Sequence, residues 1–131
     1  MLDVGILKNK KVLYVEDDES IMEAFKSVLQ KLFGEVFTAY NGEDGLEIFK
    51  KNPNVDFVIT DIKMPKMDGL EMAKTIHEID PAIPCILTTA HAEYDYYLKA
   101  DAIGVYRYIT KPLDIKKLVE ALIQYDKIKE N

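Results

Sequence analysis

The sequence has 131 residues, of which 48% are hydrophobic and 31% are charged, which predicts one globular domain with an ordinary core. The net charge of -6 disfavours direct binding to nucleic acid, and the single cysteine, Cys85, excludes a disulfide framework within the chain. The chain starts without a signal-peptide pattern, and its apolar runs fall short of the about 18 residues that a membrane helix needs. We therefore predict a cytoplasmic protein that contacts neither nucleic acid nor a membrane.

Strand and helix patterns alternate five times along the chain. Short apolar runs predict strands at residues 11–15, 35–40, 55–61, 84–90 and 105–110. Helical spacing predicts helices at about 20–33, 46–51, 70–79, 92–103 and 113–127. Ser20 is the expected start of the first helix and Gly34 its C-terminal cap, while residues 41–45 are expected to form a turn. We expect a domain over 11–127, with a loose N-terminal extension (1–10) and C-terminal tail (128–131).

This alternation predicts an α/β fold with a doubly wound parallel sheet and helices on both faces. Polar residues stand where four of the strands end: Glu16 and Asp17, Asp61, Thr88 and Thr89, and Lys111. The carboxyl ends of parallel strands share one edge of the sheet, and ligands of open α/β sheets bind there. We therefore expect three carboxylates, a hydroxyl and an ammonium to converge in one crevice.

Three neighbouring carboxylates repel one another, so a cation or a protonated partner has to accompany them. An oxygen-seeking divalent ion such as Mg²⁺ suits this cluster better than zinc, because the strand ends supply no cysteine or histidine ligand apart from His91 just beyond the fourth strand. With the ion bound, Asp61 becomes a candidate nucleophile toward a phosphoryl group, assisted by Lys111 and Thr89. Each feature also has an ordinary structural explanation, such as acidic residues at a helix N-terminus, but the combination favours a site.

Four motifs carry a resemblance to a known family, and they run V-L-Y-V-E-D-D-E, D-I-K-M-P-K-M-D-G, L-T-T-A and Y-I-T-K-P. In order and spacing they resemble the receiver domain of two-component response regulators, over about Lys11 to Lys127. The resemblance implies the flavodoxin-like receiver fold, with five strands in the order 2-1-3-4-5 and five flanking helices. It also implies a signalling domain and not a turnover enzyme.

The resemblance further implies a role for each matching residue. Asp61 would accept a phosphoryl group from a sensor histidine kinase or a phosphotransfer protein. Mg²⁺, or alternatively Mn²⁺, would be held by Asp17, Asp61 and the backbone carbonyl of Lys63, with Glu16 acting through water. The phosphoryl group would lie near three further residues, Thr89, Ala90 and Lys111. Pro112 matches a proline that the family holds in a cis peptide bond, and Pro65 and Gly69 match residues that shape the loop after Asp61.

A two-state switch is the implied mechanism, in which Thr89 moves toward the phosphoryl group and Tyr108 turns inward. The surface of the fourth helix, fifth strand and fifth helix would then change and control a downstream protein target or an output domain. This region holds five tyrosines, Tyr94, Tyr96, Tyr97, Tyr106 and Tyr108. They either cover the sheet edge or form a surface for a partner or a homodimer.

Three alternatives remain at this point. A phosphatase of the haloacid dehalogenase type needs a second aspartate two residues after its nucleophile, where this chain has Lys63. A flavodoxin-like FMN protein needs a phosphate-binding loop after the first strand, which is missing here. An interaction module that works without phosphorylation is disfavoured because Glu16, Asp17, Asp61, Thr89 and Lys111 are all present. His77 is expected to be a solvated surface residue, and His91 lies where the family varies.

Overall fold

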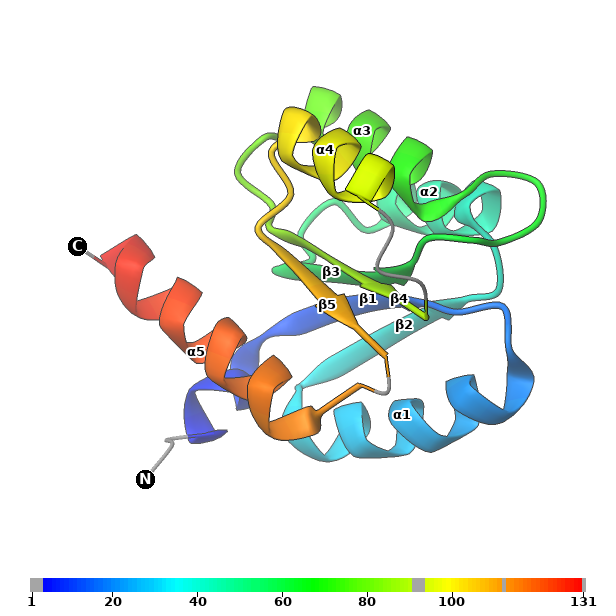
Figure 1. The fold of residues 1–131 in the computed structure, drawn as a ribbon. Helices are drawn as coiled ribbons and strands as arrows, with labels where there is room; N and C mark the ends of the chain where they lie inside the picture. Colours follow the sequence, from blue (N-terminus) through cyan, green and yellow to red (C-terminus); the bar gives the residue numbers. More distant parts are fainter. Residues whose placement is uncertain (1–3, 91–93, 112, 131) are drawn as a thin grey trace.

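The computed structural model describes residues 4–90, 94–111 and 113–130 (Figure 1). The strands are β1 (Lys11–Val15), β2 (Glu35–Ala39), β3 (Phe57–Asp61), β4 (Cys85–Thr89) and β5 (Arg107–Thr110). The helices are α1 (Glu19–Leu32), α2 (Gly42–Lys51), α3 (Gly69–Ile79), α4 (Tyr94–Ile103) and α5 (Ile115–Glu130), preceded by a short 3-10 helix, η1 (Val4–Asn9). The predicted alternation of strands and helices is thereby confirmed.

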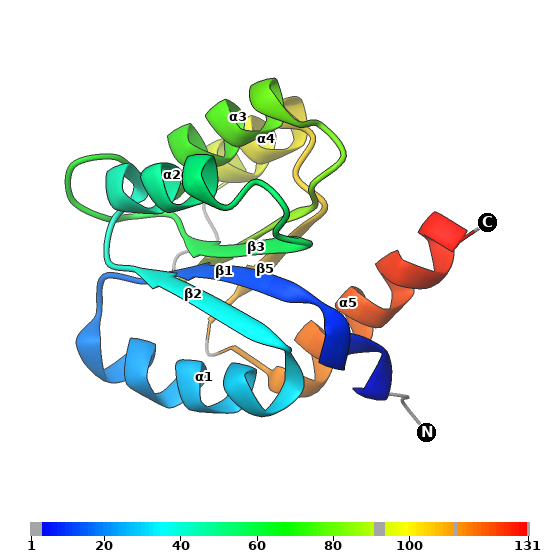
Figure 2. The same ribbon diagram turned by 180° about the vertical axis from the view of Figure 1, so that it is seen from behind.

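All five strands are parallel and form one sheet in the order β2-β1-β3-β4-β5, as predicted. Helices α2, α3 and α4 cover one face, and α1, α5 and η1 cover the other (Figures 1 and 2). The strand order reverses at β1, because β2 lies on one side of it and β3 on the other. In such sheets the crevice for ligands lies outside the carboxyl ends of the strands at this reversal.

Each face of the sheet carries its own hydrophobic core. Leu13 and Val15 of β1 join the core under α2 and α3, whereas Val12 and Tyr14 join the core under α1 and α5. Successive side chains of a strand point to opposite faces, so a strand buried on both faces is apolar along most of its length. For this reason β3 and β4 begin as apolar runs in the sequence, and their polar residues stand at their carboxyl ends.

Side-chain caps set two helix starts differently from the prediction. Asp18, and not Ser20, caps α1, because its Oδ1 accepts a hydrogen bond from the Ile21 amide (3.0 Å). Asn41 caps α2 through the Asp44 amide (2.8 Å), so most of the predicted turn at 41–45 is already helical. In both places a capping side chain satisfies an amide that would otherwise lack a partner.

Gly34 serves a different purpose from the predicted cap. Phe33 ends α1 with an extended backbone, and positive φ among the described residues occurs at Lys66 and Gly104 only. A Cβ atom on Gly34 would lie 2.5 Å from the carbonyl oxygen of Lys8. Glycine is therefore required here by the close approach of η1, and not by a left-handed conformation.

The segment before β1, which was predicted to be loose, packs onto the domain in the structure. Leu7 of η1 is fully buried in the core under α1 and α5, and Lys8 Nζ donates to the Lys31 carbonyl at the end of α1 (2.7 Å). Helix α5 continues past Lys127 to Glu130. The segment before β1 is thus part of the packed domain.

His77, predicted to be solvated, is half-buried, and its ring would lie 3.3 Å from a Cβ on Gly104. Among the described residues, no helix is long and apolar enough to cross a membrane.

Candidate functional site

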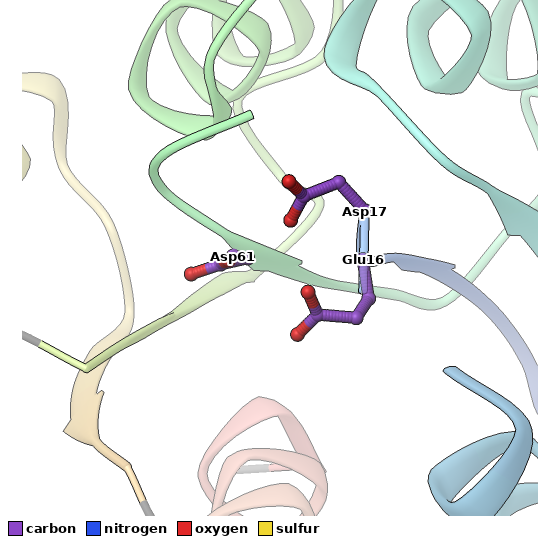
Figure 3. Close-up of side chains that lie close together, drawn as sticks. All are labelled: Glu16, Asp17 and Asp61. Carbon is purple, nitrogen blue, oxygen red and sulfur yellow. The ribbon is translucent and has the colours of Figure 1, made fainter. Parts of the chain in front are cut away.

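The carboxyl ends of β1 and β3 bring three acidic side chains together, as predicted (Figure 3). One carboxylate oxygen from each of Glu16, Asp17 and Asp61 lies within 4.8 Å of the others. Glu16 and Asp17 directly follow β1, and Asp61 is the last residue of β3. Residues far apart in the sequence therefore form one cluster because their strands are neighbours.

The acidic residues that follow β1 have different structural roles, which their hydrogen bonds to the backbone show. Glu16 is 1% exposed; its amide donates to the Ala39 carbonyl (3.1 Å), and its Oε2 accepts from the Asp18 amide (3.1 Å). Asp17 is exposed at the crevice, while Asp18 caps α1. Both explanations of the run thus hold: Glu16 and Asp17 belong to the cluster, and Asp18 serves the helix.

Lys111 links the cluster to the end of β5. Its Nζ lies 2.7 Å from Glu16 Oε1 and 3.4 Å from Asp61 Oδ2, and its amide donates to the Thr89 carbonyl (2.6 Å). Burial alone would lower the pKa of Lys111, but the hydrogen bond to Glu16 and the charges of Asp61 and Glu16 outweigh it and raise that pKa. The lysine is therefore held as a cation.

Burial raises the pKa of both carboxyl groups that contact Lys111. For Asp61, Lys111 and the Ile62 amide, which donates to Oδ1 (2.9 Å), offset this effect only in part. For Glu16, the hydrogen bonds from Lys111 and Asp18 likewise fail to offset it. Three carboxylates and one ammonium leave two net negative charges, which one divalent cation would balance.

The donor atoms of the cluster fit a hard divalent ion. All three side-chain ligands are carboxylate oxygens, as Mg²⁺ and Mn²⁺ prefer, and the described residues form no second group of this kind. Lys63, the expected source of a carbonyl ligand, lies two residues after Asp61, and its ammonium stands 5.5 Å from the Tyr96 ring centroid.

The loop between β3 and α3 is shaped by its backbone. Lys66 adopts a φ of 67°, Asp68 caps α3, and the Gly69 amide donates to the Ile62 carbonyl (2.8 Å). A Cβ on Gly69 would lie 1.9 Å from the carbonyl oxygen of Asp61. Glycine is thus needed beside the acidic residue. The left-handed conformation falls on Lys66, which carries no sequence signal for it.

The remaining predicted residues surround the end of β4. Thr89 is 1% exposed, Ala90 directly follows the strand and is exposed, and Tyr108 of β5 is half-buried. The Tyr108 ring meets Tyr97 of α4 edge to face, with 6.0 Å between ring centroids. Pro112 and His91 lie outside the described residues.

The tyrosines of this region were predicted either to cover the sheet edge or to form a partner surface, and the structure contains examples of both. Tyr106 is structural, because its hydroxyl donates to the Ala121 carbonyl (2.7 Å) and its ring lies under Arg107 (4.2 Å). Tyr97 is 51% exposed and lies on the outer surface of α4. Of these two tyrosines, Tyr97 is therefore available at the surface and Tyr106 is held against α5.

Two residues near the cluster, Thr60 and Tyr14, were not predicted from the sequence. The Thr60 hydroxyl donates to the Asp61 carbonyl (2.9 Å), and Tyr14 lines a cleft with Lys111. Burial, followed by the negative charges of Glu16 and Asp61, raises the pKa of Tyr14. Both residues stand inside apolar strand runs, where a hydroxyl gives no local signal of its position.

Fold and site together define a doubly wound α/β domain with an acidic, lysine-linked crevice at the switch point of its sheet. The family model of the response regulator receiver domain matches residues 12–123. The chain is 34% identical to sporulation initiation phosphotransferase F of Bacillus subtilis (strain 168), over 95% of this chain and 100% of that protein. It is 37% identical to chemotaxis protein CheY of Treponema pallidum (strain Nichols), over 86% of this chain and 79% of that protein.

Solved structures agree with these relatives. A response regulator receiver domain protein from Clostridium thermocellum superimposes with a TM-score of 0.84 at 32% identity, covering 92% of this chain and 97% of that one.

The chain spans only 26% of the transcriptional regulatory protein GlrR of Escherichia coli (strain K12), to which it is 32% identical over 88% of its own length. The chain belongs to the receiver domain family of two-component response regulators, and its acidic cluster lies at the phosphorylation site of that family. Domains of this family are signalling domains and not classical turnover enzymes.

Proposed function

We propose that this chain is a phosphorylation-operated switch in which Asp61 accepts a phosphoryl group from a phosphohistidine of a sensor kinase or a phosphotransfer protein. The observation that carries the proposal is the position of Asp61 at the end of β3, with Lys111 Nζ 3.4 Å from its Oδ2 and two further acidic side chains beside it. Asp61 is largely buried at the base of this cluster, so most of its surface is shielded from bulk water.

The residues of the crevice have distinct tasks in this transfer. An Asp61 carboxylate oxygen forms the new bond to phosphorus while the bond from phosphorus to the histidine nitrogen breaks. Lys111 supplies a fixed positive charge to the phosphoryl oxygens, and the Thr89 hydroxyl is a hydrogen-bond donor to them. Ala90 leaves space for the group because it carries a single methyl.

A metal ion is part of the proposed site. Asp17, Asp61 and the Lys63 carbonyl would hold Mg²⁺, or alternatively Mn²⁺, with Glu16 acting through water. When bound, the ion neutralises negative charge on the carboxylates and on the phosphoryl oxygens. The chain is 27% identical to CheY of Borrelia burgdorferi, with a TM-score of 0.82. That relative has been solved in a CheX-CheY-BeF3-Mg²⁺ complex.

The proposed output is a change on the α4-β5-α5 surface. Movement of Thr89 toward the phosphoryl group frees space into which Tyr108 turns, and this changes its edge contact with Tyr97 of α4. A downstream protein, an output domain or a second copy of the chain would bind the altered surface. The exposed side chains of Tyr97 and Leu98 support a binding surface there.

Intact-mass measurement after incubation with acetyl phosphate tests the phosphoacceptor. We expect one adduct of about 80 Da, dependent on Mg²⁺, in the wild type and in Asp101→Asn, an exposed acidic control on α4. Asp61→Asn should form no adduct while keeping the wild-type circular dichroism spectrum. A folded, Mg²⁺-binding wild type without an adduct would instead indicate an interaction module that works without phosphorylation.

A further inference from the structure

An apolar cleft opens beside the phosphoacceptor crevice, between the first half of α1 and the start of α5. Its volume is about 430 Å³, and the lining residues are Tyr14, Ile21, Phe25, Thr88, Ala90, Lys111 and Leu113. Ile21, Phe25 and Leu113 are only partly buried, so part of their apolar surface faces the cleft and not the core. Such a concave apolar site with a few polar groups at one end is typical of a small-molecule site.

The cleft borders the acidic crevice at Lys111. Lys111 lines the cleft, and the same ammonium contacts Asp61 and Glu16. Thr88 pairs with Asp61 across the sheet, and Ala90 follows the switch threonine. A molecule whose phosphoryl group meets Asp61 could therefore place an attached apolar group in the cleft.

We propose that this cleft binds the acyl group of a small acyl phosphate donor and favours bulky apolar acyl groups, aromatic ones included. This inference rests on the proposed function of Asp61. Acyl phosphates combine the two required parts, because an anionic phosphoryl end suits Lys111 and the metal ion while the acyl end suits the apolar walls. Two of the lining residues, Tyr14 and Phe25, are aromatic, and aromatic groups pack favourably against one another.

The transfer step balances without an added reactant. An Asp61 carboxylate oxygen forms a bond to phosphorus, and the bond from phosphorus to the bridging acyl oxygen breaks. The electron pair of that bond stays with the leaving carboxylate, so no proton needs to move. The products are the aspartyl phosphate and the free carboxylate of the donor.

Rates of adduct formation with benzoyl phosphate and acetyl phosphate test the proposal in the presence of Mg²⁺. Ile21→Trp fills the cleft and should lower the benzoyl-to-acetyl rate ratio roughly tenfold, as a poorly fitting pocket does. Ile79→Trp, a change at an exposed apolar position on α3, is the matched control and should keep the wild-type ratio. Equal ratios in all three proteins would overturn the proposal. If acetyl phosphate also gave no adduct with the wild type, the proposed function itself would fail.

A binding measurement separates recognition from transfer. Phenacylphosphonate carries a methylene in place of the bridging oxygen and cannot transfer its phosphorus. In amide NMR spectra with Mg²⁺, we expect it to shift Ile21 and Leu113, and methylphosphonate to leave both unshifted. Identical shifts with both ligands would contradict the proposal. Sedimentation provides a second check. If the wild type sedimented as a dimer and Ile21→Trp as a monomer, the proposal would be overturned, because a second copy of the chain would then occupy the cleft.

Discussion

At the scale of single residues, buried charge determines how the metal-free domain responds to pH. Burial raises the pKa of Asp61 above 3.8 and that of Glu16 above 4.5, so the folded protein holds these protons more tightly than the unfolded chain does. Their contribution to stability is therefore fully present below the unfolded pKa values and is lost as pH rises through the higher folded values. In EDTA, stability should therefore fall from this source as the pH rises above the unfolded pKa values of 3.8 and 4.5.

Asp61→Asn tests this argument, because it removes one charge while Glu16 remains paired with Lys111 at 2.7 Å. We expect the variant, in EDTA at pH 7, to be more stable than the wild type by about 1 kcal/mol, with a shallower dependence on pH. Urea unfolding at several pH values measures both quantities. The exposed control Asp101→Asn should follow the wild-type curve, and a less stable Asp61→Asn would refute the account.

A second residue-scale prediction concerns Gly69. The Asp61 carbonyl group lies against Gly69, because glycine has no side chain. A Cβ atom on Gly69 would lie 1.9 Å from the Asp61 carbonyl oxygen and 2.9 Å from the Asp61 carbonyl carbon. Gly69→Ala should cost about 1–3 kcal/mol of unfolding free energy, because backbone has to move. Gly45→Ala is the comparison: its Cβ would meet the flexible end of Met72 at 2.7 Å and Val15 at 2.9 Å, and alanine favours the helix. Equal losses in thermal or urea unfolding would contradict this ranking.

At the scale of elements, α4 is the helix least held by the core. Ala100 is its only buried residue among those whose burial is described, whereas α3 buries five, Gly69, Leu70, Met72, Ala73 and Ile76. Hydrogen exchange should therefore be about tenfold or more faster in α4 than in α3, because few buried contacts oppose local opening. If α4 is the moving part of the switch, beryllofluoride with Mg²⁺ should change exchange in α4 and leave α3 unchanged. Slow exchange in α4 would refute its weak anchorage.

At the scale of the whole molecule, η1 joins α1 and α5 on one face of the sheet. Leu7 is fully buried there, in the core shared by both helices. Leu7→Ala should lower the unfolding free energy by about 2–5 kcal/mol, whereas Val4→Ala, at a residue 39% exposed, should change it by less than about 0.5 kcal/mol. Chemical denaturation measures both variants. A Leu7→Ala protein of wild-type stability would show that η1 is not needed for the fold.

The sequence by itself determined the local features of this protein. Short apolar runs and the 3.6-residue periodicity depend only on neighbouring residues, so they predicted every strand and α-helix of the domain. The ends of those strands then placed Asp61, Glu16 and Lys111 in one crevice, because neighbouring parallel strands share an edge. The strand order came from the resemblance to the receiver family and not from periodicity.

Tertiary structure decided the features that depend on long-range contacts. Leu7 is buried only because α1 and α5 both pack against η1, and Gly34 must be small because η1 approaches it. Tyr14 lines a cleft because Lys111, 97 positions later in the chain, closes the same space. The physical reason is that a side chain's burial and charge environment are fixed by groups distant in the sequence, which no local pattern records.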